Sequence, residues 1–130
     1  MDIYIGHSSS IDFKEQLYQP LRNSSLDDEH NIVLPHEDSD EPFDSKEFLK
    51  NECDVFVAEV SEASTGLGIE IGWADLYEVS VICIYREKAE ISGSLSVLNA
   101  EMIAYKDRED MINAITEVIE EEYNENRTTG

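Results

Sequence analysis

Glu70 is the residue whose surroundings most strongly suggest chemistry. It lies in the segment STGLGIEIGWA (64–74), among glycines and bulky apolar residues, where the sequence predicts the first turn of a buried helix. A capping box would require Ser or Thr three residues earlier, but that position is Leu67. A basic partner three or four positions away is also missing. Two interpretations remain: an interaction with the positive end of the helix, and a carboxylate kept for function, which we favour.

The neighbours of Glu70 indicate what such a carboxylate could do. Desolvation by Leu67, Ile69 and Trp73 would oppose its ionisation, whereas the helix N-terminus favours it. A carboxylate that stays ionised there is a competent nucleophile toward an electrophilic sugar carbon. The nearby glycines follow the spacing G-x-G-x-x-x-G, which does not match the dinucleotide-binding fingerprint. They allow a ligand to approach the backbone N–H groups at the helix start.

Polar residues near other predicted strand ends are further candidates, most of them with a structural alternative. Glu59 lies near the carboxyl end of the buried run VFVAEV and either binds a sugar hydroxyl or forms a structural ion pair. Asp44 either acts on the base of a ligand or caps the helix that follows it. Ser64 either caps its helix or donates to a phosphate or sugar. His7 and His36 directly follow the first two strands, so both point toward one cleft.

Alternating strands and helices would position these residues. We predict strands at 3–5, 31–35, 53–60, 79–85 and 102–105, and helices at 11–23, 46–51, 67–79 and 108–123. This pattern predicts a single α/β domain over residues 1–123 with a doubly wound, flavodoxin- or Rossmann-like five-stranded parallel sheet in the order 2-1-3-4-5. Ligands of such sheets bind beyond the carboxyl ends of the strands. We expect Pro20 to end or bend the first helix, and residues 124–130 to fray as a tail.

Composition disfavours several classes of partner. Thirty acidic residues against nine basic ones give the 130-residue chain a formal charge of −21. We expect no nucleic acid and no membrane partner, because anionic backbones and surfaces bind clustered Lys and Arg. No apolar run approaches the roughly 20 residues of a membrane helix. Residues 1–10 do not show the pattern of a secretory signal, so we expect a cytoplasmic protein in which Cys53 and Cys83 are free buried thiols.

The segment DVFVAEVSEASTGLGIEIGWA (54–74), with IYIGHSSS at 3–10, resembles the nucleoside 2-deoxyribosyltransferase superfamily. Within that superfamily it is most similar to the 2′-deoxynucleoside 5′-monophosphate N-glycosidases. The resemblance implies that Glu70 is the nucleophile that forms a glycosyl ester, with Tyr4 near the reacting centre. It assigns Asp44 to the base or leaving group, although the spacing of Asp44 to the third strand is longer here. His36 lies beside the position of a histidine that frames the base pocket.

The resemblance also implies a binding site for the sugar and its 5′ substituent. Ser64 and the amides that follow it would bind a 5′-phosphate or 5′-hydroxyl. Phosphate-preferring members often have an arginine in the loop after the first strand, and the sequence GHSSS here weakens a phosphate preference. Ser92 would reach the site of a neighbouring subunit, which implies a homodimer or higher homo-oligomer. The candidate substrate-binding residues are Gly6, His7, Ser8, His36, Glu59, Ser64, Gly66, Gly68 and Ser92.

We therefore expect an enzyme that cleaves or exchanges the N-glycosidic bond of a (2′-deoxy)nucleoside or its 5′-monophosphate. Its partner would be a small-molecule nucleoside or nucleotide, and no metal or organic cofactor is expected, because Glu70 supplies the nucleophile. No H-x-x-x-H or H-x-H spacing indicates a metal site. The alternative is a non-catalytic module that senses a nucleotide or an ADP-ribose-like ligand on the same fold. A receiver-like domain is disfavoured, because its clustered aspartates and lysine at strand ends are missing.

Overall fold

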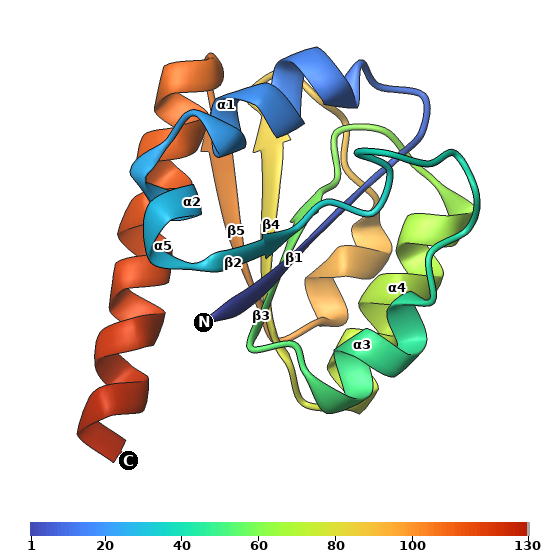
Figure 1. Ribbon diagram of the computed structural model, residues 1–130. Helices are drawn as coiled ribbons and strands as arrows, with labels where there is room; N and C mark the ends of the chain where they lie inside the picture. The colour runs from blue at the N-terminus through green and yellow to red at the C-terminus, as the bar shows by residue number, and fades with distance from the viewer. Residues whose placement is uncertain (130) are drawn as a thin grey trace.

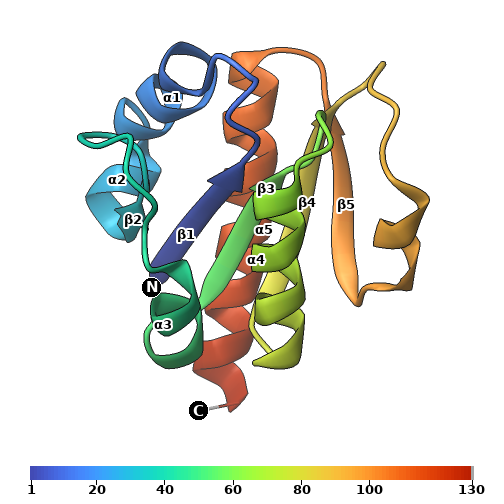
Figure 2. The same ribbon diagram turned by 90° about the vertical axis from the view of Figure 1, so that its right-hand side faces the viewer.

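The computed structural model describes the backbone of residues 1–129 and the side chains of residues 1–125. Its centre is a sheet of five parallel strands in the order β2-β1-β3-β4-β5, which confirms the predicted topology. The carboxyl ends of the strands lie along one edge of the sheet, at the top of Figure 2. The strands are β1 (Asp2–His7), β2 (Asn31–Val33), β3 (Val55–Glu59), β4 (Ser80–Arg86) and β5 (Ala100–Tyr105).

Helices cover both faces of this sheet (Figure 1). One face carries a π-helix, η1 (Lys14–Tyr18), and the α-helices α1 (Gln19–Arg22), α2 (Ser25–Glu29) and α5 (Arg108–Thr129). The other face carries α3 (Ser45–Asn51), α4 (Thr65–Leu76) and a 3-10 helix, η2 (Gly93–Val97). The result is the three-layer α/β architecture that the alternation of elements predicted.

Side chains of the central strands alternate between two apolar cores. Ile3 and Val55 belong to the core under α1, α2 and α5, whereas Tyr4 and Phe56 belong to the core under α3 and α4. The central strands are therefore buried on both faces, which explains their nearly unbroken apolar runs in the sequence. The two cores fix the strands from both sides, so that the loops at their carboxyl ends start from defined positions.

The first helical segment continues across Pro20 and is widened just before it. The sequence predicted a helix over 11–23, and the structure has η1 followed directly by α1. The N–H of Gln19 donates to the carbonyl of Lys14, five residues earlier. Pro20 has no N–H to donate, and in a regular α-helix its ring would collide with a carbonyl of the preceding turn. The wider π-turn accommodates the ring, so Pro20 does not end the helix.

Several helix boundaries differ from the predicted ones. α4 starts at Thr65 and ends at Leu76 rather than spanning 67–79, because Glu78 takes a left-handed conformation (φ 60°) that turns the chain toward β4. α5 continues to Thr129 instead of ending at residue 123, and no Pro or Gly interrupts residues 108–129. The fraying of residues 124–130 stays a prediction, and Gly130 lies outside the described residues. The short helices α2 and η2 have too few residues to produce a periodic pattern.

The sequence also predicted two free buried thiols and no membrane-spanning helix. Cys53 is half-buried and Cys83 is buried, and both are free thiols. Burial raises the pKa of Cys53 to about 12 and that of Cys83 to about 11, so both sulfurs stay protonated. Across residues 1–129, none of the helices combines the length and apolar character that crossing a bilayer requires.

Gly6 occupies a position on β1 where a larger residue would not fit. A Cβ there would lie 2.6 Å from the Phe56 ring and 3.0 Å from Leu67, whereas a Cβ on Gly72 would meet nothing within 4 Å. We expect Gly6→Ala to lower the free energy of unfolding by about 1–3 kcal/mol through overpacking. The matched Gly72→Ala should raise it by up to about 1 kcal/mol, because Gly weakens a helix interior. Urea denaturation measures both, and a Gly6→Ala variant as stable as the parent would contradict this packing.

Candidate active site

A cavity of about 410 Å³ lies at the carboxyl ends of β1 and β3, where the order of the strands reverses. β1, the loops after β2 and β3 and the first turns of α4 form its walls, and we call it the Glu70 cavity. Its volume is in the range of small-ligand sites. Its lining residues are Tyr4, His7, Ser9, His36, Pro42, Phe43, Ser45, Ser64, Gly66, Leu67, Ile69, Glu70 and Trp73.

Tyr4 and Glu70 are joined by a hydrogen bond in this cavity. The Tyr4 hydroxyl donates to Glu70 Oε2 over 2.5 Å. Burial, followed by the charge and the hydrogen bond of Glu70, raises the pKa of Tyr4 far above its ordinary value, so the hydroxyl remains a donor. Glu70 is half-buried, and its Oε1 has no hydrogen-bond partner among the described residues. One carboxylate oxygen is therefore fixed, and the other is open to a ligand.

Glu70 lies deeper in α4 than the sequence predicted. Ser64 is the N-cap and accepts from the N–H of Leu67 over 3.4 Å, which places Glu70 in the second turn rather than the first. The effect of a helix terminus is largely confined to the first turn, so it does not account for this carboxylate. Ile69, which was expected to desolvate Glu70, is 49% exposed, whereas Tyr4 and Leu67 are buried.

The start of α3 places Ser45, not Asp44, in the Glu70 cavity. Ser45 is buried and lines the cavity together with Tyr4. Asp44 is exposed, does not line the cavity, and accepts from the N–H of Glu47 over 3.3 Å as the N-cap of α3. Of the two roles that the sequence left open for Asp44, the structure shows the helix cap. The sequence analysis missed Ser45, since only its position just after a candidate helix cap could have indicated it.

His7 has both ring nitrogens engaged in hydrogen bonds. Its Nδ1 donates to the Ser8 carbonyl over 2.9 Å, so its Nε2 accepts from the Tyr18 hydroxyl over 2.6 Å. The ring stacks on Phe13 at a centroid distance of 4.3 Å. Burial lowers the pKa of His7, against a smaller opposing effect of the Ser8 carbonyl. His7 therefore lines the cavity as a neutral side chain.

Tyr18 connects His7 to the loop after β2. Its hydroxyl donates to His7 and accepts from the backbone N–H of His36 over 3.1 Å. The side chain is buried, and burial raises the pKa of Tyr18 to about 12. The sequence analysis did not select Tyr18, because these partners are distant in the sequence and no local pattern records them.

Aromatic side chains give the Glu70 cavity flat surfaces. Phe43 stacks on Tyr4 with ring centroids 5.8 Å apart and an interplanar angle of 21°, and it is 40% exposed. Trp73 also lines the cavity, and Lys46 Nζ lies 5.8 Å from the centroid of its ring. Rings of this kind stack on nucleobases irrespective of base identity.

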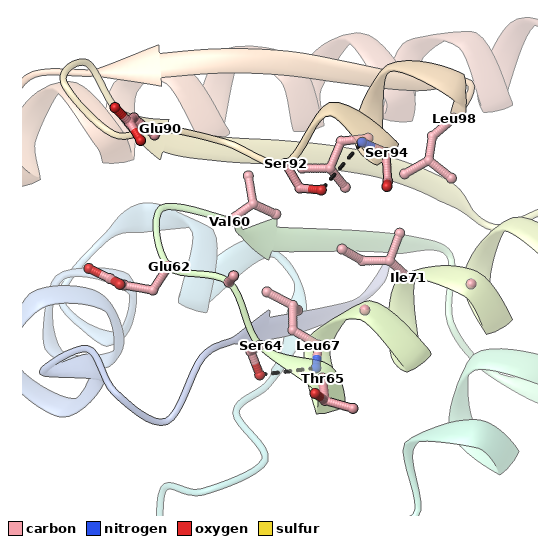
Figure 3. A pocket seen from close by; sticks show the side chains of 14 residues that line it. Val60, Glu62, Ser64, Thr65, Leu67, Ile71, Glu90, Ser92, Ser94 and Leu98 are labelled. Carbon is pink, nitrogen blue, oxygen red and sulfur yellow. Dashed lines mark hydrogen bonds between the residues drawn. The ribbon is translucent and has the colours of Figure 1, made fainter.

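A second cavity, of about 500 Å³, lies between the start of α4 and η2 (Figure 3). Its lining is mainly apolar, and Ser92 lines it as the N-cap of η2. Ser64 and Leu67 line both cavities, whereas Gly66 lines only the Glu70 cavity and Gly68 only the second. The predicted binding residues are thus divided between two spaces that meet at the N-terminus of α4.

Gly6 and Ser8 line neither cavity. Gly6 lies in the interior of β1, and the Phe56 ring occupies the space next to it. Ser8 is buried, and its hydroxyl is hydrogen-bonded to that of Ser10 over 2.7 Å. Both residues shape the end of β1 from which His7 extends.

Glu59 also lies outside both cavities, in a buried hydrogen-bond network. It is 2% exposed and accepts from the N–H of Ser61 over 2.6 Å, from the Ser61 hydroxyl over 3.0 Å, and from the Tyr105 hydroxyl. These donors satisfy the buried carboxylate. The partners are an amide and two hydroxyls, not the basic residue that an ion pair would require.

Comparison with known proteins identifies the fold. No protein-family model and no curated protein matches the chain. Among solved structures, the CMP N-glycosidase BcmB of Clostridium botulinum is similar, with a TM-score of 0.65 over 89% of this chain and 99% of that one. The chain shares the fold of BcmB. At 20% sequence identity the likeness concerns the fold, and at that level it confirms the resemblance that the sequence indicated.

The neutral ring of His7 predicts a pH dependence of stability. Its pKa lies below 6.5 in the folded protein and returns to about 6.5 on unfolding. As the pH falls through 6.5, the unfolded chain binds a proton before the folded one does, so the free energy of unfolding decreases in that window. His7→Gln should show a shallower decrease. An NMR titration should place the His7 midpoint below 6.5, and a midpoint at or above that value would contradict the buried neutral ring.

Proposed function

We propose that the chain cleaves the N-glycosidic bond of a (2′-deoxy)nucleoside or its 5′-monophosphate through a covalent glycosyl–Glu70 intermediate. The observation that carries this proposal is the pairing of Glu70 with Tyr4 in a cavity of about 410 Å³. Tyr4 fixes Oε2, and Oε1 remains to approach C1′ of a bound sugar. A positioned carboxylate beside aromatic surfaces suits nucleophilic attack on a nucleoside.

The reaction proceeds in two displacements at C1′. Glu70 Oε1 forms a bond to C1′ while the C1′–N bond breaks, and the electron pair of that bond leaves with the base, which takes up a proton. Water then attacks C1′, the ester bond to Glu70 breaks, and the water gives up a proton. A second base in place of water would give base exchange. The double displacement corresponds to that of retaining glycosidases.

The 5′ end of the substrate lies at the start of α4 in this proposal. The hydroxyl of Ser64 and the backbone N–H groups around Gly66 supply donors there. None of the lining residues of the Glu70 cavity within the described chain is Lys or Arg. BcmB acts on CMP; here a phosphate would rest on hydroxyl and amide donors alone, so a free 5′-hydroxyl fits the charge of the cavity better.

Glu70→Gln is the variant that tests the nucleophile. Incubation with a panel of nucleosides and 5′-monophosphates, followed by chromatography, should detect free base with the parent protein. Glu70→Gln should reduce that release by roughly a thousandfold or more, because the amide is not a nucleophile, while ligand binding persists. Glu117→Gln, an exposed residue of α5, is the matched control and should retain activity. Ligand binding without any release of base by the parent would instead support the sensing module.

We also propose that two copies of the chain associate through the second cavity. Leu76 on α4 and Val97 on η2 are 70% and 87% exposed, and Ser92 lines the mainly apolar space between these helices. An association here would cover this apolar surface and bring Ser92 toward the site of the other copy.

Ser92→Ala tests that arrangement together with light scattering. We expect a dimer in solution, and a KM for the monophosphate that rises about 3- to 10-fold in Ser92→Ala with kcat unchanged, since one hydrogen bond contributes about 0.5–1.5 kcal/mol. Ser96→Ala, on the same short helix, is the control. A strict monomer, or an unchanged KM in Ser92→Ala, would contradict a role for Ser92 in binding.

A further inference from the structure

Departure of a nucleobase requires a proton. When the C1′–N bond breaks, its electron pair remains on the ring, and an anionic base is a poor leaving group. A positioned proton donor typically contributes about 10²–10⁴-fold to such a step. The Glu70 cavity must therefore contain, or admit, an acid besides the nucleophile.

Four titratable side chains line the Glu70 cavity within residues 1–129: Tyr4, His7, His36 and Glu70. The Tyr4 hydroxyl donates its hydrogen bond to Glu70, which is the proposed nucleophile. Both ring nitrogens of His7 are engaged, one by a backbone carbonyl and one by a buried hydroxyl. This leaves His36 as the titratable lining residue with a ring nitrogen available to a ligand.

Asp44 is the residue to which the resemblance assigned the leaving group, and its geometry does not favour that role. Its carboxylate caps α3 by accepting from the N–H of Glu47, and the residue is exposed. Its neighbours Phe43 and Ser45 line the Glu70 cavity, whereas Asp44 does not. The side chain that α3 presents next to Tyr4 is the Ser45 hydroxyl, which is too weak an acid to protonate a base.

His36 is fixed at its backbone and at one ring nitrogen. Its N–H donates to the Tyr18 hydroxyl over 3.1 Å, and its Nδ1 donates to the Ser39 carbonyl over 3.2 Å. Nε2 has no hydrogen-bond partner among the described residues. The ring is half-buried, with its centroid 6.0 Å from that of His7. Orientation by a second group while one nitrogen stays open is the arrangement that general acids of this type have.

We propose that His36 is the general acid that protonates the departing base, an assignment that rests on the proposed N-glycosidase function. The imidazolium donates its Nε2 proton to a ring nitrogen or carbonyl oxygen of the base as the C1′–N bond breaks, and the base leaves neutral. The neutral imidazole then takes the proton of the water that attacks C1′. Glu70 is released as a carboxylate, so protons and charge balance over the cycle.

The groups around His36 are compatible with this proton transfer. His7 faces it as a neutral ring, and Tyr18 faces it through a protonated hydroxyl. Glu37, the next residue, is paired with Arg22 through two hydrogen bonds of 2.8 Å. Glu70 shares the cavity.

Leaving-group dependence tests the assignment. On a nucleoside, His36→Gln should lower kcat by about 100-fold or more. On 4-nitrophenyl 2-deoxyriboside, whose leaving group departs as a stable anion, the same variant should release the first equivalent of 4-nitrophenolate at a rate within about threefold of the parent, because the first displacement then requires no acid. Glu70→Gln should be inactive on both substrates. His30→Gln, whose ring contacts Met1 and Tyr123 away from the cavity, is the matched control and should retain both activities.

Other outcomes would overturn the assignment. An equal loss in the rates at which the first equivalents of base and of 4-nitrophenolate are released by His36→Gln would indicate a structural role, as would the failure of imidazole to restore nucleoside cleavage in a folded His36→Ala. A loss confined to the nucleoside in Asp44→Asn, with His36→Gln active, would return the role to Asp44. If the parent protein releases neither base nor 4-nitrophenolate, the proposed function itself fails, and the assignment fails with it.

Discussion

The hydrogen bond between Tyr4 and Glu70 joins the centre of the sheet to α4, and the geometry of the cavity depends on it. Tyr4 is 1% exposed and is packed among apolar side chains of one core. A phenolic hydroxyl at such a position needs a partner, and leaving it unpaired would cost about 1–3 kcal/mol. The second turn of α4 provides that partner. This one hydrogen bond therefore holds both the Glu70 carboxylate and α4 in place relative to β1.

The polar groups at the strand ends divide into two sets with different consequences. On β3 and β5, Glu59 and Tyr105 satisfy one another together with Ser61, whose hydroxyl also accepts from the N–H of Arg86. That set connects loops, and its residues line neither cavity. In the Glu70 cavity the contacts are incomplete, since Glu70 Oε1 and the Nε2 of His36 have no hydrogen-bond partner among the described residues. We therefore expect substrate to bind and react in the Glu70 cavity, not at the network around Glu59.

The negative charge of the chain disfavours anionic ligands as well as anionic macromolecular partners. A formal charge of −21 on 130 residues repels anions at long range. The Glu70 cavity compensates with amides at the start of α4, with hydroxyls and with neutral aromatic rings, rather than with Lys or Arg among its described lining. These groups favour a substrate that is recognised through stacking and hydrogen bonds.

The sequence by itself determined the parallel sheet, its strand order and the exceptional position of Glu70, because apolar periodicity, crossover handedness and helix spacing are local or general constraints. Only the tertiary structure decided which polar residues accompany Glu70. One residue of difference at the start of α3 turns Asp44 outward and Ser45 inward. The partners of Tyr18 and Glu59 come from elements far away in the chain. No short pattern records such contacts, since they exist only after the layers have packed.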